Sequence, residues 1–184
     1  MEQTNLQRRR WLSLGGIILG TSLLPNSVLA LVSTPKPLLL RLRNINTDEV
    51  LTASYSHKGF SSLTLNRLNH IMRDRRTNQT HPIDPNLFLK LTQIQTRLGV
   101  RNAEVNIISG YRSPKTNAKM HRYSRGVARN SYHTRGQAVD FNISGVPLRR
   151  IKEVSESLRN GGVGYYPRSN FVHVDTGPVR TWHG

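Results

Sequence analysis

The chain has 184 residues, with 27 lysines and arginines, ten acidic residues and no cysteine. This length fits one domain with a short extension. The lack of cysteine excludes disulfides and thiolate ligands, so any metal site must use histidine, aspartate or glutamate. The formal net charge of +17 indicates an anionic partner.

Residues 1–30 have the organisation of an export signal. Three arginines at positions 8–10 precede a mainly apolar stretch at 11–24, and Val28-Leu29-Ala30 offers a small-residue cleavage site. The apolar stretch is short and interrupted by glycine, which disfavours a membrane span. The segment "RRRWLSLGG" resembles a twin-arginine signal; the alternatives are an ordinary secretory signal and an uncleaved anchor. We therefore expect a periplasmic protein with no stable membrane span once the signal is removed.

Removal of this signal changes the partners that the charge suggests. It takes away three arginines and one glutamate, which leaves 24 basic and nine acidic residues, a net charge of +15. Such a charge by itself suggests nucleic acid, but an exported protein rarely meets nucleic acid, and the sequence holds no recognised nucleic-acid-binding motif. The cell wall is a more suitable polyanion because its stem peptides carry free carboxylates. Part of the charge is expected to be a solubilising surface.

Residues 31–37 are predicted to form a linker, and residues 38–184 one domain of strands and helices. The expected strands lie at 40–43, 50–55, 105–108, 137–143, 163–166 and 170–175, and the expected helices at 63–75, 87–98, 116–121 and 147–160. Asp84-Pro85 is an expected helix start, and Gly99 an expected stop. This order indicates an α+β domain with a mostly antiparallel sheet and flanking helices.

The stretch "SYHTRGQAVDFNI" at 131–143 places a histidine and an aspartate on either side of a glycine. Alternate residues of a strand share a face, so Asp140 is turned away from Val139 and Phe141, which are expected in the core. An unpaired buried carboxylate is costly, and a metal ion shared with His133 would satisfy it. The alternative is a loop histidine and an edge carboxylate with no shared role.

A further histidine lies in the stretch "NFVHVDTG" at 170–177. His173 and Asp175 are expected on one strand face, together with Phe171. A lone histidine in an apolar strand is more often structural than a ligand. Two histidines and one carboxylate, however, are the protein ligands of an open, catalytic zinc site whose fourth position holds water.

These motifs resemble those of a known family. The pattern S-x-H-x-x-G-x-A-x-D at 131–140, followed by a histidine in a strand, resembles the zinc peptidases of the D-Ala-D-Ala carboxypeptidase and hedgehog fold. The stretches "SGYRSPKTNA" at 109–118 and "VGYYPRSNFVHVDTGPVRTW" at 163–182 look more specifically like the MepK-type murein endopeptidases. The resemblance covers roughly residues 35–184 and implies a hedgehog-like α+β fold.

The resemblance also implies roles for individual residues. His133, Asp140 and His173 would bind Zn2+, and Arg112 would steady the substrate carbonyl. Zinc polarises a scissile carbonyl and acidifies a bound water, while a fixed guanidinium stabilises the developing oxyanion. The alternative for Arg112 is a surface arginine in a turn.

The general base is left open by the sequence. Related enzymes place an acid or a histidine two or three residues before the last ligand, whereas this chain has Asn170 and Phe171, which cannot accept a proton. Asp175, roughly 6–7 Å along the strand from His173, is one candidate, and His183 is the other. The alternative for Asp175 is to orient a ligand imidazole without taking part in proton transfer.

Aromatic and basic side chains near these motifs suit a cleft for an anionic substrate. Four tyrosines either line this cleft or pack half buried, namely Tyr111, Tyr132, Tyr165 and Tyr166. Five basic residues would suit the free carboxylates of stem peptides, namely Lys115, Lys119, Arg122, Arg125 and Arg129.

The sequence thus predicts a periplasmic, monomeric zinc metallopeptidase that hydrolyses amide bonds in the peptide cross-links of peptidoglycan. One alternative is a D,D-carboxypeptidase that trims stem peptides, since either peptidase needs the same three ligands. The other is a non-catalytic wall-binding module that keeps a structural zinc.

Exchange of the arginines at positions 8–10 for lysines tests the predicted export route. The twin-arginine receptor reads the arginines themselves and not only their charge, so unprocessed precursor should accumulate in the cytoplasm. Cell fractionation and immunoblotting measure the precursor. Normal processing of the variant would instead indicate an ordinary secretory signal.

Overall fold

The computed structural model describes residues 38–124 and 126–184. The expected export signal and linker lie outside the described residues. Within this part of the chain, seven strands form one sheet in the order β2-β1-β3-β4-β6-β5-β7. Their bounds are β1 Leu38–Asn44, β2 Val50–Tyr55, β3 Val105–Ser109, β4 Ala138–Ile143, β5 Gly162–Tyr166, β6 Phe171–Asp175 and β7 Arg180–His183.

The sheet is mixed, and most neighbouring strands run antiparallel. Strands β1 and β2, β3 and β4, β4 and β6, and β5 and β6 pair antiparallel, whereas β1 with β3 and β5 with β7 are parallel. The predicted α+β class is confirmed, and most strand pairs are antiparallel as expected, although two parallel pairs make the sheet mixed. They arise because the chain returns through helices before β3 and through a turn before the short strand β7, which the sequence analysis did not predict.

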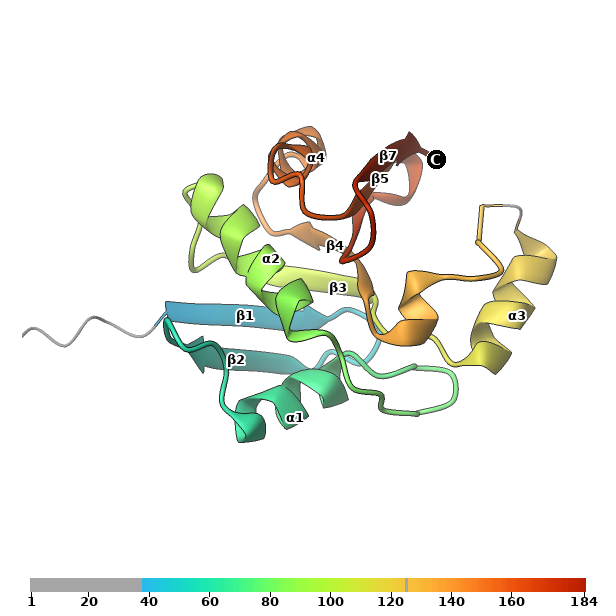
Figure 1. Ribbon diagram of the computed structural model, residues 1–184, viewed down its shortest axis with the longest axis horizontal. Helices are drawn as coiled ribbons and strands as arrows, with labels where there is room; N and C mark the ends of the chain where they lie inside the picture. Colours follow the sequence, from blue (N-terminus) through green and yellow to red (C-terminus); the bar gives the residue numbers. More distant parts are fainter. Residues whose placement is uncertain (1–37, 125) are drawn as a thin grey trace, which may run out of the picture. The chain divides into compact units, whose positions relative to one another are not determined.

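Three helices cover one face of this sheet (Figure 1). They are α1 Ser62–Ile71, α2 Pro85–Arg97 and α4 Leu148–Ser157, while α3 Pro114–Tyr123 lies apart from the sheet. The expected start of α2 is confirmed, since the Asp84 side chain accepts a hydrogen bond from Asn86 N at 2.9 Å. None of the described helices is long and apolar enough to cross a membrane.

Helix α1 ends earlier than the sequence analysis predicted. We expected helix over 63–75, but the last helical residue is Ile71. The chain then turns, and the backbone N–H of Asp74 donates to Gln79 O at 2.9 Å. This turn brings residues 74–76 to the side of the molecule that holds the candidate site.

The strands near the C-terminus have one apolar and one polar face, as the alternation predicted. Val139, Phe141, Val172 and Val174 are buried in the core beneath the helices. The residues between them face the other side of the sheet, and Asp140 lies directly opposite His173 in the pairing of β4 with β6. The core therefore fixes the register that places these two polar side chains together.

A buried lysine ties the core helix α2 to the end of β6. Lys90 Nζ donates to the backbone oxygen of Asp175 at 2.9 Å and to that of Asn160 at 3.4 Å. Burial lowers the pKa of Lys90 to about 8. Because the ammonium group replaces its lost water with backbone carbonyls, Lys90 anchors the strand end from the core side.

A tight turn positions His133. It lies in a 3₁₀ helix, η1 (Tyr132–Arg135), and its backbone N–H donates to the capping Ser131 side chain. Gly136 ends this helix with φ +68°, and a Cβ atom there would overlap the carbonyl oxygen of Pro82. Only glycine therefore fits at this position, both for its backbone angle and for the space it leaves.

Gly136→Ala should destabilise the protein more than Gly145→Ala does. Gly145 has a similar φ of +74° but nothing within 4 Å of its Cβ position, so it reports the cost of the backbone angle alone. That cost is about 1–2 kcal/mol, and the overlap with Pro82 should add to it. Urea unfolding of both variants measures the difference, and equal losses would show that the turn relaxes without penalty.

Candidate metal centre

His133, Asp140 and His173 meet in one buried cluster. Each offers one ligand atom, and these atoms all lie within 4.8 Å of one another. Oδ1 of Asp140 is 3.2 Å from His133 Nε2 and 2.8 Å from His173 Nδ1, and the two ring nitrogens are 3.2 Å apart. The three residues that the sequence analysis singled out for a metal are thus brought together.

The far nitrogen of each imidazole has a hydrogen-bond acceptor, which determines which nitrogen faces the cluster. His133 Nδ1 lies 2.7 Å from the backbone oxygen of Gly110, and His173 Nε2 lies 3.1 Å from Asp175 Oδ2. Since both acceptors are oxygens without a proton, these nitrogens carry the N–H. The remaining nitrogens, Nε2 of His133 and Nδ1 of His173, can then offer their lone pairs to a shared metal ion.

Asp140 divides its two carboxylate oxygens between the imidazoles and an arginine. Oδ1 faces the two histidines, while Oδ2 accepts a hydrogen bond from Arg112 Nη2. Arg112 Nε donates to Ser109 Oγ at 2.8 Å, and its backbone N–H donates to His133 O at 3.1 Å. The arginine is therefore a fixed part of the cluster.

Asp175 is held behind His173 by four donors besides the imidazole. The N–H groups of Gly162 and Gly177 both donate to Oδ1 at 2.9 Å. The Arg180 guanidinium donates to Oδ1 at 3.1 Å and to Oδ2 at 2.6 Å. Asp175 has no exposed surface and touches the edge of His173 that points away from the other two ligands.

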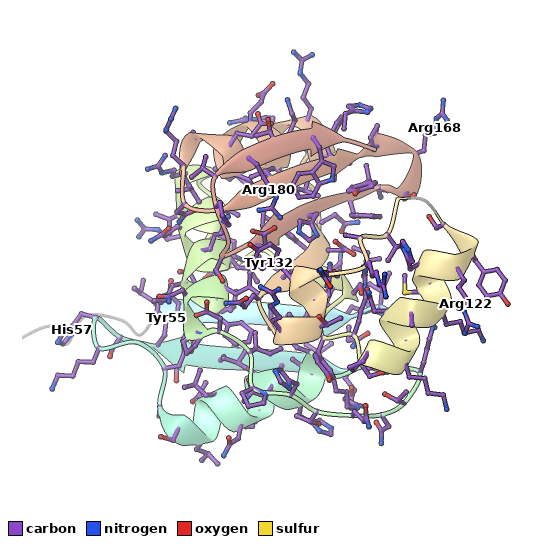
Figure 2. All side chains as sticks on the ribbon, turned by 45° about the vertical axis from the view of Figure 1, so that its right-hand side comes forward. Tyr55, His57, Arg122, Tyr132, Arg168 and Arg180 are labelled. Carbon is purple, nitrogen blue, oxygen red and sulfur yellow. The ribbon has the colours of Figure 1, made fainter. Side chains whose placement is uncertain are left out.

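The rings of two aromatic residues enclose Arg180. Its guanidinium carbon lies 4.9 Å from the centre of the Tyr132 ring and 5.0 Å from that of Trp182. Figure 2 shows Tyr132 and Arg180 close together in the middle of this face. The Trp182 ring also lies 5.1 Å from that of His173, over the space left by Gly164. Strand β7 thus completes the surroundings of His173.

The protonation states of the cluster follow from burial and charge. Burial lowers the pKa of His133 to about 4, so this imidazole is neutral at neutral pH. Burial acts in the same direction on His173, but hydrogen bonds to Asp140 and Asp175 outweigh it and raise the pKa of His173. A metal ion must displace the proton that this favours at Nδ1, so metal affinity should rise with pH.

Burial opposes ionisation of the two aspartates, but their partners outweigh it. Attraction to His133 and Arg112 holds the pKa of Asp140 well below its usual range. Hydrogen bonds from His173, Arg180 and two backbone N–H groups likewise lower the pKa of Asp175. Both carboxylates are therefore ionised across the physiological range.

A cleft of about 940 Å³ lies beside the cluster. His133, Asp140, His173 and Arg112 line it, as do three of the predicted tyrosines, Tyr111, Tyr132 and Tyr166. Six of its lining residues are basic, namely Arg73, Arg75, Arg76, Arg112, Lys119 and Arg180, whereas two are acidic, Asp74 and Asp140. The cleft therefore favours an anionic ligand.

The structure does not bring every predicted residue to the cleft. His183 pairs with Tyr165 across β7 and β5, so both lie on the face of the sheet opposite His173. Asp175 is near the cluster but is enclosed behind His173. Of the five predicted basic residues, Lys119 lines the cleft, and Arg122 points outward from α3 (Figure 2).

Several cleft residues were missed by the sequence analysis. Arg180 reaches Asp175 only through the turn between β6 and β7, and Arg75 and Arg76 belong to the turn after α1. The adjacent residues "DRR" at 74–76 were a possible signal, but a charge run is usually a solvated surface.

Comparison with known proteins identifies the family. A family model described as peptidoglycan L,D-endopeptidase MepK matches residues 32–182. The chain belongs to this family. The resemblance stated from the motifs is therefore confirmed over nearly the whole described domain.

Curated relatives agree with the family match along their full length. The probable peptidoglycan L,D-endopeptidase MepK of Haemophilus influenzae is 63% identical over 185 residues, covering 100% of both chains. The peptidoglycan L,D-endopeptidase MepK of Escherichia coli strain K12 is 49% identical over 183 residues, covering 99% of this chain and 100% of the relative. No solved structure matches the chain.

Proposed function

We propose that this chain is a zinc metallopeptidase that hydrolyses amide bonds in the peptide cross-links of peptidoglycan. The observation that carries the proposal is the cluster of His133, Asp140 and His173, whose ligand atoms come from a turn and two adjacent strands and lie within 4.8 Å of one another. The family match supplies the class of reaction, because its members are named for cutting peptidoglycan.

The donor set fits zinc better than other common metals. Two imidazole nitrogens and one carboxylate oxygen are the protein ligands of many catalytic zinc sites, which leave one position open. The cleft lies on the open side of the cluster. When bound there, zinc supplies a Lewis acid that polarises a carbonyl and lowers the pKa of water.

Arg112 is positioned to bind the substrate carbonyl. Its Nη2 and Nε are used by Asp140 and Ser109, and among the described residues its Nη1 has no hydrogen-bond partner. This leaves one N–H edge for the oxygen on which negative charge develops during amide hydrolysis. A donor fixed before the reaction stabilises that charge without reorganisation.

Asp175 supports the cluster as a positioning residue. It receives the Nε2–H of His173 and so holds the ring with Nδ1 toward Asp140. Arg180 and two backbone N–H groups keep the carboxylate ionised and fixed. This arrangement favours the orienting role over the general-base role, because Asp175 does not line the cleft where water would bind.

The names of the relatives favour cross-link cleavage over removal of a terminal D-alanine. Both relatives are named L,D-endopeptidases, and this chain aligns with each over essentially its full length. We also propose a periplasmic location, because a cross-link hydrolase must reach the wall. The export signal predicted at residues 1–30 provides the route.

Purified protein should release muropeptides from intact peptidoglycan sacculi, and a chelator should stop the release. The His133→Ala variant removes one ligand and should lose both bound zinc and activity. Chromatography and mass spectrometry of the products show which amide is cut, and elemental analysis gives about one zinc per chain for the unchanged protein.

Each other outcome of this assay selects an alternative. Loss of terminal D-alanine with intact cross-links would indicate a carboxypeptidase. Sedimentation with sacculi without any product would indicate a wall-binding module with a structural zinc. Zinc content unaffected by His133→Ala would rule out the proposed centre.

Asp175→Asn should weaken zinc binding by about 10–100-fold, the usual effect of losing a hydrogen-bond partner of a ligand histidine. Excess zinc should then restore most of the activity. A general-base role predicts the opposite pattern, with zinc affinity kept and turnover reduced by about 10²–10⁴ even at saturating zinc. Asp48→Asn is the matched control, because Asp48 is exposed and pairs only with Arg43.

A further inference from the structure

We infer that Arg76 forms a subsite for a free carboxylate of the substrate peptide next to the scissile amide. The inference rests on the proposed function and adds to it a chemical requirement on the substrate. Arg76 lines the same cleft as the metal cluster, and neither the family match nor the names of the relatives assign it a role.

The turn that carries Arg76 is fixed to the floor of the cleft. Asp74 Oδ1 accepts the backbone N–H of Arg76 at 2.9 Å, and Asp74 Oδ2 accepts that of Ser113 at 2.8 Å. The turn is closed by the bond from Asp74 N to Gln79 O and by Arg73 Nε donating to Asn78 Oδ1 at 2.7 Å. Asp74 therefore connects the turn directly to the residue that follows Arg112.

Among the described residues, Asp74 forms no salt bridge with the arginines around it. Its side chain is buried, and neutral donors occupy its oxygens, namely backbone N–H groups and the side chains of Ser113 and Thr116. These bonds lower the pKa of Asp74 despite its burial. The charge of Asp74 thus serves to hold the two segments together.

Some of the other basic residues of the cleft form ion pairs within the protein, and others do not. Arg73 pairs with Glu49, and Arg180 pairs with Asp175, so both are satisfied within the protein. Arg75, Arg76 and Lys119 form no ion pair among the described residues. The positive charge on this wall of the cleft is therefore left for a ligand.

Arg76 is the member of this set whose backbone is tied, through Asp74, to the residue that follows Arg112. Burial lowers the pKa of Arg76, repulsion from Arg75 and Arg112 adds to this effect, and attraction to Asp74 opposes it. A cleft guanidinium that forms no ion pair with a described residue gains from a ligand carboxylate. Planar guanidinium groups match the two oxygens of a carboxylate.

A carboxylate subsite at Arg76 selects the substrate by a group that takes no part in the hydrolysis. Arg112 Nη1 is the edge proposed for the scissile carbonyl. Because Asp74 ties the Arg76 backbone to the residue that follows Arg112, we assign the carboxylate at Arg76 to a residue next to that carbonyl. Peptides that carry a free carboxylate next to the scissile amide should be bound, and peptides amidated at that carboxylate should be bound less well.

A pair of synthetic cross-linked peptides tests the inference, one with the free carboxylate and one with a carboxamide in its place. With the unchanged protein loaded with zinc, KM should be about tenfold lower for the carboxylate peptide, at similar kcat. Loss of one charge-assisted hydrogen bond accounts for a change of this size. In Arg76→Gln the KM for the carboxylate peptide should rise about tenfold, while that for the amide should change little.

Two controls separate this effect from general loss of charge or structure. Arg122→Gln removes an equal charge from α3 outside the cleft and should leave both KM values unchanged. Zinc content and the urea midpoint of Arg76→Gln should equal those of the unchanged protein, because the Arg76 side chain is exposed and forms no hydrogen bond with a described residue. The KM of Arg76→Lys for the carboxylate peptide should fall between those of the unchanged protein and Arg76→Gln, since lysine keeps the charge but lacks the planar guanidinium group.

The outcomes distinguish the inference from the proposed function. If the unchanged protein cuts both peptides equally well, or if Arg76→Gln raises both KM values alike, the carboxylate subsite is wrong and the peptidase function stands. If the unchanged protein cuts neither peptide nor sacculi, the proposed function fails, and the subsite fails with it.

Discussion

The carboxylate of Asp140 is the group on which the rest of the site depends. One of its oxygens faces two imidazoles and the other accepts a hydrogen bond from Arg112, so a single side chain joins the metal ligands to the group proposed for the carbonyl. Burying such a charge is costly unless it is surrounded by partners. The histidines and Arg112 are these partners, and they are also the groups that the chemistry needs.

The two faces of the sheet have separate tasks. One face builds the core with α1, α2 and α4, while the other carries the cluster. Since side chains alternate along each strand, a one-residue shift of register would turn the ligands toward the core and expose the core valines. The free energy of core packing thus maintains the geometry of the site, and Lys90 adds a direct link from α2 to the end of β6.

The sequence predicted those parts of the molecule that depend on local pattern. Strand alternation placed Asp140 and His173 on one face, and the Asp84-Pro85 start of α2 was confirmed, because both follow from neighbouring residues. The predicted ligand cluster was assembled as expected, although its metal and the role of each ligand stay predictions. The proposed hedgehog-like fold also stays a prediction.

The features that the sequence did not predict depend on contacts between distant segments. Strand β7 is short and pairs in parallel with β5, so no alternation of its own indicates which face His183 or Trp182 takes. The positions of Arg76 and Arg180 depend on turns closed by hydrogen bonds, which leave no repeating pattern in the sequence.

The position of β7 has a consequence for the order in which the site is completed during folding. Its residues supply Arg180, which neutralises the buried Asp175, and Trp182, which packs beside His173. Both residues follow Arg112, His133, Asp140 and His173 in the chain. The surroundings of His173 are therefore complete only once β7 has joined the sheet beside β5.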